Sequence, residues 1–141
     1  MSVAMILAPL FVQVTLTLIL LIGMAYVRGG ALRRGEAKVE SIALREPNWP
    51  RPAMQWANAY ANQFELPVLF YVLTILSMAT RHADLLFVLL AWVFVTLRVL
   101  QALVHVTSNR VRARGSLFGA SAIVLLIMWV IFMVRILLGL P

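Results

Sequence analysis

The first 27 residues of the chain, MSVAMILAPLFVQVTLTLILLIGMAYV (1–27), contain no charged side chain. A membrane-spanning helix needs about 20 consecutive apolar residues, so this stretch is long enough to cross a bilayer. A cleaved signal peptide would have a basic start and a shorter apolar segment, and neither feature is present here. We therefore expect a retained transmembrane helix over residues 4–27.

The remaining composition is also typical of a membrane protein. Of the 141 residues, 63% are hydrophobic and 12% are charged, whereas soluble domains carry about 45–50% apolar and about 25% charged residues. Further apolar stretches at 54–79, 85–107 and 116–138 are long enough to span a bilayer. Short turns join the later stretches, so consecutive spans should be antiparallel neighbours. The sequence predicts one domain over 1–141, an all-α integral membrane protein built as an antiparallel four-helix transmembrane bundle.

Basic residues are unevenly distributed among the predicted loops. Two loops, residues 28–53 and the loop after the third span, hold most of them: Arg28, Arg33, Arg34, Lys38, Arg45, Arg51, Arg110, Arg112 and Arg114. Loops rich in Lys and Arg tend to stay in the cytoplasm. We expect loops one and three to be cytoplasmic and both termini to lie on the opposite side of the membrane, with a short helix near 37–44 in the first loop.

The chain contains few of the residues that bind metals or carry out thiol chemistry. The chain has no cysteine, which excludes a cysteine nucleophile and a thiolate metal site, so any thiol must come with the substrate. It has two histidines among few carboxylates, too few for an ordinary zinc or di-iron site. We predict no metal centre. A nucleic-acid partner is not expected either, because membrane topology accounts for the basic residues and no aromatic platform accompanies them.

Polar side chains inside the second and third spans recur at helical spacing, which places them on one stripe of each helix. The two stripes consist of Gln55, Asn58, Asn62 and Glu65, and of Arg98, Gln101 and His105. An ionisable side chain at membrane depth costs about 2.5–3.5 kcal/mol on insertion scales, and such groups line cavities or pair with one another. Because adjacent antiparallel spans can face each other, the stripes predict a polar cleft.

The depth of these residues predicts which of them meet. Glu65 should form an ion pair with Arg98 at the floor of the cleft, Asn62 should lie opposite Gln101, and the arginines of the third loop should surround the mouth. A basic mouth favours an anionic ligand from the cytoplasm, and Pro67 should kink the second span beside the cleft. The alternative is that these polar groups only hold the bundle together by hydrogen bonds of about 0.6 kcal/mol each.

Two segments, NQFELPVLFY (62–71) and RVLQALVHVTSNRVRARG (98–115), resemble the MAPEG family, the membrane-associated proteins in eicosanoid and glutathione metabolism. The bacterial branch is the most similar, and the length, the spans and the basic first loop fit as well. The resemblance implies a homotrimer in a bacterial inner membrane, with glutathione as co-substrate bound between protomers at the cytoplasmic side. Family members include glutathione transferases, peroxidases and leukotriene or prostaglandin synthases.

The resemblance also implies roles for individual residues. Asn62 and Glu65 match the pair that holds the glutathione backbone, and Arg98 matches the arginine that begins the motif of the third helix. Arg114 matches an arginine that polarises the glutathione thiol, and His105 stands where several relatives have a tyrosine. A nearby guanidinium favours the thiolate of a thiol whose usual pKa is about 8.5. The resemblance therefore makes Arg114 and His105 the candidate catalytic residues.

The sequence departs from the family pattern at Asn58, where many relatives have a basic residue, and at Gln101–Ala102, where bacterial relatives often have His-Ser. Fewer cations then remain to hold the glutathione carboxylates, although Asn58 and Gln101 stay candidate binding residues with Asn62, Glu65 and Arg98. Our leading hypothesis is a glutathione-dependent transferase or peroxidase acting on a lipophilic electrophile that enters from the membrane lipids. The alternative is a non-catalytic membrane subunit or lipid-binding protein with a degenerate site.

Overall fold

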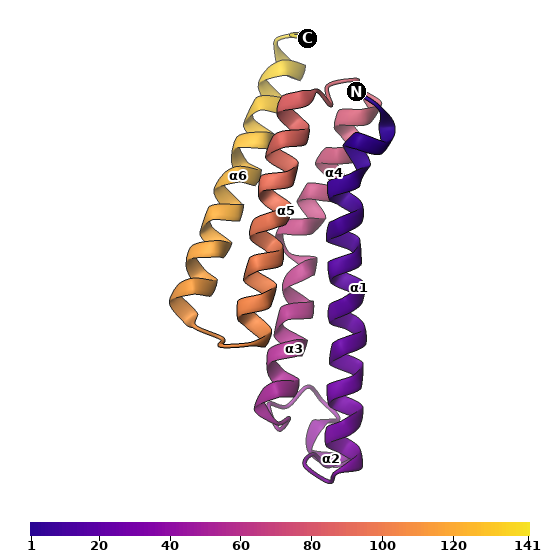
Figure 1. The fold of residues 1–141 in the computed structure, drawn as a ribbon, viewed down its shortest axis with the longest axis vertical. Helices are drawn as coiled ribbons and strands as arrows, with labels where there is room; N and C mark the ends of the chain where they lie inside the picture. Colours follow the sequence, from indigo (N-terminus) through magenta and orange to yellow (C-terminus); the bar gives the residue numbers. More distant parts are fainter.

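A computed structural model describes residues 1–141 and is all-helical (Figure 1). Its elements, in chain order, are α1 (Val3–Arg33), α2 (Val39–Ile42), α3 (Arg51–Ala61), the 3₁₀ turn η1 (Asn62–Phe64), α4 (Leu66–Ala79), α5 (Leu85–Val106) and α6 (Val111–Leu137). Four stretches are long and apolar enough to cross a membrane: Val3–Arg33, Arg51–Ala79, Leu85–Val106 and Val111–Leu137. The predicted fold, a four-helix transmembrane bundle, is confirmed.

The two ends of the bundle differ in what they carry. Both chain termini and the turn between α4 and α5 lie at one end, which we call the terminal end (Figure 1). The other, the basic end, carries α2 and the turn between α5 and α6. Helices α1 and α6 extend further at the basic end than the apolar pattern predicted, to Arg33 and from Val111 respectively. Long basic side chains allow this extension, because they keep their charge in water while the stem covers apolar surface.

Apolar packing is concentrated in the terminal half of the bundle. Ten buried side chains form one cluster there: Ile6, Phe70, Leu73, Phe87, Val88, Ala91, Phe94, Val95, Leu125 and Met128. Phe70 of α4 stacks on Phe94 of α5 with ring centroids 4.8 Å apart. The basic half has a smaller cluster of Leu20, Ala59 and Ala102. The sequence therefore packs one half of the bundle tightly with large side chains and leaves the other half to small and polar ones.

The second span is not one continuous helix. Helix α3 ends at Ala61, the chain passes through η1, and α4 begins at Leu66 after Glu65, whose backbone is not helical (φ −96°, ψ −105°). Pro67 explains the break, because proline lacks an N–H and its ring clashes with the carbonyl of the residue four positions earlier, here Gln63 in η1. The span predicted over 54–79 is present, and at the place where a kink was predicted beside Pro67 the helix is interrupted over residues 62–65. We call residues 62–65 the unwound turn.

Candidate functional site

A cavity of about 410 Å³ lies at the basic end, between the second span and helices α5 and α6. Ligand pockets of proteins usually enclose about 300–1,000 Å³. The cavity, called the site cavity below, is lined by Asn58, Ala61, Asn62, Glu65, Gln101, His105, Arg114, Gly115 and Phe118. Six of the seven predicted site residues are in this lining, and the seventh, Arg98, is not. The structure thus brings together residues from three separate segments of the chain.

Asn62 joins the two polar stripes. With its amide nitrogen toward the carboxylate, Asn62 donates to Glu65 at 2.9 and 3.3 Å, and its amide oxygen accepts from Gln101 Nε2 at 3.0 Å. This orientation satisfies both neighbours, whereas the opposite one would place oxygen against oxygen. The predicted pairing of Asn62 with Gln101 is present. Glu65 itself is solvent-exposed and has no cation bonded to it, so its carboxylate stays free to accept a ligand's donors.

His105 of α5 and Arg114 of α6 form a second polar group in the lining. Nη1 of Arg114 lies 2.9 Å from His105 Nε2 and donates to Asn109 Oδ1 at 2.9 Å. An arginine nitrogen only donates, so His105 Nε2 must be the unprotonated acceptor and the imidazole is neutral in this arrangement. Asn109 has a left-handed backbone (φ 52°), a conformation that asparagine tolerates well. Two neutral acceptors therefore orient the guanidinium of Arg114 without neutralising its charge.

Arg98 does not form the ion pair predicted with Glu65. The ion pairs of the chain are Arg34–Glu36 and Arg135–Asp84. Arg98 is fully buried beneath the site cavity, and its Nη2 donates to the backbone carbonyl of Asn62 at 3.0 Å. The broken helix explains this difference, because the unwound turn leaves the Asn62 carbonyl available to a side-chain donor. Arg98 thus contacts the backbone of the site instead of its carboxylate.

The expected ring of arginines around the mouth is also absent. Arg110 and Arg112 are exposed and do not line the site cavity, because the helix start at Val111 directs them away from it. Arg114 is the one arginine in the lining. Together with Glu65 it gives the cavity a formal charge near zero. The site is therefore suited to a ligand that carries both positive and negative groups, more than to a simple anion.

Sequence reasoning missed several residues that shape the site. Gly115 and Phe118 line the cavity from the first turns of α6, and nothing lies within 4 Å of where a Cβ on Gly115 would stand. Asn109 orients Arg114 from the turn before α6. Gln63 is 2% exposed and accepts a hydrogen bond from Gln13 of α1 at 2.8 Å. Asparagine in the short SNR turn is a residue that tolerates positive φ, and this could have identified Asn109 as a turn residue. No sequence pattern relates Gln13 to Gln63.

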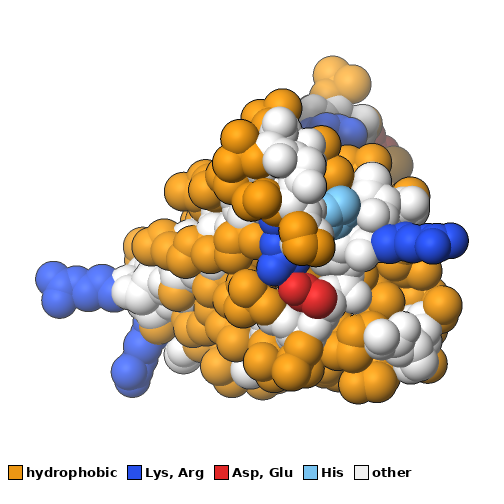
Figure 2. All heavy atoms as spheres, turned by 90° about the horizontal axis from the view of Figure 1, so that it is seen from above, with side chains coloured by type: hydrophobic (Ala, Val, Ile, Leu, Met, Phe, Trp, Pro, Cys, Tyr) orange, Lys and Arg blue, Asp and Glu red, His pale blue; other side chains and the backbone are white.

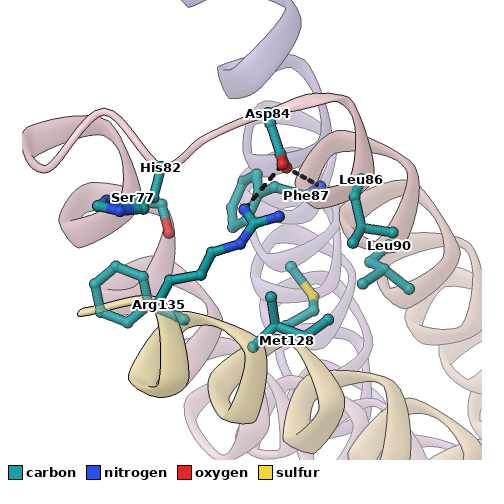
Figure 3. Close-up of a pocket in the computed structure, with 10 residues that line it drawn as sticks. Ser77, His82, Asp84, Leu86, Phe87, Leu90, Met128 and Arg135 are labelled. Carbon is teal, nitrogen blue, oxygen red and sulfur yellow. Dashed lines mark hydrogen bonds and ion pairs between the residues drawn. The ribbon is translucent and has the colours of Figure 1, made fainter. Parts of the chain in front are cut away.

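A second cavity lies at the terminal end, and Figure 3 shows its lining. Arg135 reaches from α6 to Asp84, with Nη1 2.8 Å from Oδ2, and the other carboxylate oxygen accepts from the backbone N–H of Phe87 at 3.0 Å (Figure 3). Burial acts to raise the pKa of Asp84, but the Phe87 N–H and Arg135 outweigh it and hold that pKa below its usual value. His82 contacts Thr80 Oγ1 and the Leu140 carbonyl, each at 3.0 Å.

The surface of the terminal end agrees with this pairing. Seen from that end, hydrophobic side chains cover most of the molecule, and an acidic group lies directly against a basic one (Figure 2). Asp84 and Arg135 are partnered with each other, so the one carboxylate in this cavity is already neutralised. No group of three or more His, Cys, Asp or Glu residues that could hold a metal ion is present at either end.

Four apolar spans, a polar cavity at one end and a closed, apolar half at the other define a multi-pass integral membrane protein. The sequence model of the MAPEG family matches residues 6–134, which include the second and third spans, all but the outer ends of the first and fourth, and every residue of the site cavity. The chain belongs to the MAPEG family, whose members act in glutathione and eicosanoid metabolism. Comparisons with curated proteins and with solved structures gave no match.

Proposed function

We propose that this protein is a glutathione-dependent membrane transferase or peroxidase that acts on a lipophilic electrophile. The observation that carries the proposal is the site cavity, whose lining combines one carboxylate, one guanidinium and several amide side chains. Glutathione carries an ammonium group, two carboxylates and two peptide bonds. A cavity with mixed charge and several amides complements such a ligand better than it complements an apolar one.

The chemistry of the cavity follows from its partners. The exposed carboxylate of Glu65 is suited to the ammonium group of glutathione, and Asn58, Asn62 and Gln101 supply amide groups for its peptide bonds. Arg114 retains its full charge because His105 and Asn109 are neutral. A guanidinium beside the sulfur stabilises the thiolate, which is the nucleophilic form.

The transfer step is balanced without a metal or a cysteine from the protein. The thiol proton passes to water, the thiolate sulfur forms a bond to the electrophilic carbon, and the leaving group departs with the bonding electron pair. In the peroxidase reaction the thiolate attacks one peroxide oxygen, the O–O bond breaks, and the alkoxide leaves with the bonding electrons and takes up a proton. A second glutathione thiol then reacts with the sulfenic acid to give the disulfide and water. Because His105 Nε2 accepts from Arg114, His105 acts by orienting Arg114 and not by taking the thiol proton.

The same proposal includes the assembly and the setting of the protein. Asn58 and Glu65 are exposed, so the cavity is open on one side and a neighbouring protomer in a homotrimer would cover it. The basic end would lie in the cytoplasm of a bacterial inner membrane, with both termini outside, and glutathione would enter from that end. The electrophile would reach the cavity from the bilayer. Native mass spectrometry of the detergent-solubilised protein tests the trimer.

Turnover of a general electrophile tests the activity. We expect the purified protein to conjugate glutathione to chlorodinitrobenzene, and Arg114→Ala to lose that activity. The matched control is Arg112→Ala, which removes an exposed arginine two residues away and outside the cavity. Loss of activity in both variants, or in neither, would contradict the assigned role of Arg114.

One observation favours a second function, a non-catalytic membrane subunit or lipid-binding protein. Arg114 is the sole arginine lining the site cavity, since Arg98 is buried below it. Two glutathione carboxylates would then share one cation in this protomer. Stable co-purification with a partner complex, together with no conjugation and no glutathione binding, would favour this second function over the first.

A further inference from the structure

The unwound turn of the second span is held from two sides by side chains that do not line the site cavity. From α1, Gln13 Nε2 donates to Gln63 Oε1 at 2.8 Å, and Gln63 Nε2 donates in turn to the Ala59 carbonyl at 2.9 Å. From α5, Arg98 Nη2 donates to the Asn62 carbonyl at 3.0 Å. Gln13 and Arg98 are 0% exposed and Gln63 is 2% exposed. The turn is therefore fixed between two neighbouring helices.

The side chains of the turn point in different directions, and that of Phe64 is 56% exposed. Gln63 projects inward to α1, whereas Asn62 and Glu65 line the site cavity. Rotation or slippage of the turn would move Asn62 and Glu65 together, because both lie in the same four-residue segment. The inward contacts therefore determine where the amide and the carboxylate stand in the cavity.

Stability alone does not account for this buried network. Gln13 Oε1 and both Nε and Nη1 of Arg98 are buried without a hydrogen-bond partner. A buried polar group without a partner costs about 1–3 kcal/mol, and apolar replacements of similar volume are often neutral or stabilising. Apolar side chains at positions 13 and 63 would avoid that cost, and the residues on either side of Gln13 in the span are already apolar.

We propose that Gln13, Gln63 and Arg98 are positioning residues that clamp the unwound turn, so that Asn62 and Glu65 present their side chains to glutathione. This inference rests on the proposed function for its ligand, but the clamp itself is a property of the free protein. Loss of the Gln13–Gln63 hydrogen bond should loosen the turn and weaken glutathione binding about tenfold, while the bundle stays folded because the apolar cluster lies in the other half.

A spin label gives a readout that does not depend on glutathione. The chain contains no cysteine, so Phe64→Cys provides a unique labelling position on the turn, where the native side chain is 56% exposed. We expect Gln13→Leu in this background to increase the mobility of the label. The matched control is Thr74→Val, which removes a buried hydroxyl of the same span whose hydrogen bond, to the Phe70 carbonyl, is remote from the turn. Thr74→Val should leave the label unchanged.

Glutathione affinity is measured on the same proteins without the label. We expect Gln13→Leu to raise the Kd about tenfold and Gln63→Leu to raise it at least as much, because Gln63→Leu also removes the bond to the Ala59 carbonyl. The double variant should match Gln63→Leu, since the Gln13–Gln63 contact is already lost there. If Gln13→Leu does not fold, Gln63→Leu serves as the test variant. Thr74→Val should keep the parent Kd.

The outcomes separate the clamp from the proposed function. An immobile label in Gln13→Leu overturns the clamp, and a mobile label with unchanged glutathione affinity overturns its positioning role. If the parent protein binds no glutathione, the proposed function fails, and a mobile label would still support the clamp. Equal effects of Gln13→Leu and Thr74→Val would show a general loss of stability and would also overturn the inference.

Discussion

Both ends of the bundle carry an arginine, a histidine and a carboxylate. These charged groups form an ion pair at the terminal end and are not paired with each other at the basic end. At the terminal end, Arg135 pairs with Asp84 at 2.8 Å, and both ring nitrogens of His82 have partners. At the basic end, the guanidinium of Arg114 contacts neutral acceptors and Glu65 has no cation. Charges that neutralise each other hold a structure together. Charges left open around a 410 Å³ cavity are available to a ligand.

The type of a charged residue is therefore a poor guide to its function in this chain. Whether another residue of the protein neutralises its charge is a better guide. An arginine, a histidine and a carboxylate near a membrane surface occur at both ends. At the terminal end the arginine of α6 satisfies the carboxylate that begins α5. At the basic end the comparable arginine of α6 stays free to act on something that is not part of the protein.

Of the changes considered, we expect substitution of two arginines of α6 to have the largest effects. Arg114→Ala should lower kcat/KM for glutathione about 100-fold, as removal of one transition-state donor commonly does, and should leave the thermal midpoint near the parent value. Arg135→Ala should keep nearly full turnover and lower the midpoint slightly, because its ion pair with Asp84 is partly exposed. Conjugation assays and thermal unfolding in detergent measure both. Parallel losses in the two variants would remove the distinction between the ends.

A smaller effect is expected at the free carboxylate. Glu65→Gln keeps the size of the side chain but removes the charge that we assign to the glutathione ammonium group. Because hydrogen bonds to a charged group contribute about 1.5–3 kcal/mol, glutathione affinity should fall roughly tenfold or more. Isothermal titration checks this, with Glu36→Gln as control, since Glu36 pairs with Arg34 on the exposed loop away from the cavity. An unchanged Kd for Glu65→Gln would argue against the assigned role.

A modest change in stability is expected at the terminal end. Asp84 caps the start of α5, and loss of such a cap costs about 1 kcal/mol. For a chain of this length that corresponds to a fall in thermal midpoint of about 2–4 °C, with the partly exposed ion pair to Arg135 adding little. Thermal unfolding of Asp84→Ala tests this value, and conjugation should be unaffected. A loss of conjugation would connect the two ends functionally.

The smallest effect concerns pH. The folded protein holds the pKa of Asp84 below its usual value, so folding is favoured by the ionised carboxylate. That contribution is complete above the unfolded pKa of about 3.9 and is lost as the pH falls through the lower, folded value. The thermal midpoint should therefore decline on acidification below about pH 4, and Asp84→Asn should show a shallower decline. Identical profiles would mean that Asp84 does not contribute.

The sequence predicted the spans well, because long apolar stretches leave few alternatives. It also predicted which polar residues gather, since helical spacing and antiparallel packing place Asn62 near Gln101. The ion pair of Glu65 with Arg98 was wrong because the prediction assumed a regular helix across residues 62–65. Once the helix unwinds before Pro67, a backbone carbonyl becomes the available acceptor for Arg98.

Contacts between helices that are distant in the sequence could not be predicted either. The pairing of Gln13 with Gln63 joins residues 50 positions apart, and nothing in their local patterns relates them. Arg110, Arg112 and Arg114 look equivalent in the sequence, yet the exact start of α6 directs Arg114 to the cavity and the other two to the exterior. Small shifts in helix boundaries thus decide which of several similar residues belongs to a site.

The most direct test of the site is to fill it. Gly115 lines the site cavity, and nothing lies within 4 Å of where its Cβ would stand, so Gly115→Leu should occupy the cavity without disturbing the fold. Equilibrium dialysis with radiolabelled glutathione at millimolar concentration compares the two proteins. We predict saturable binding to the parent and none to Gly115→Leu at an unchanged thermal midpoint. No binding to the parent, or equal binding to both, would contradict the account.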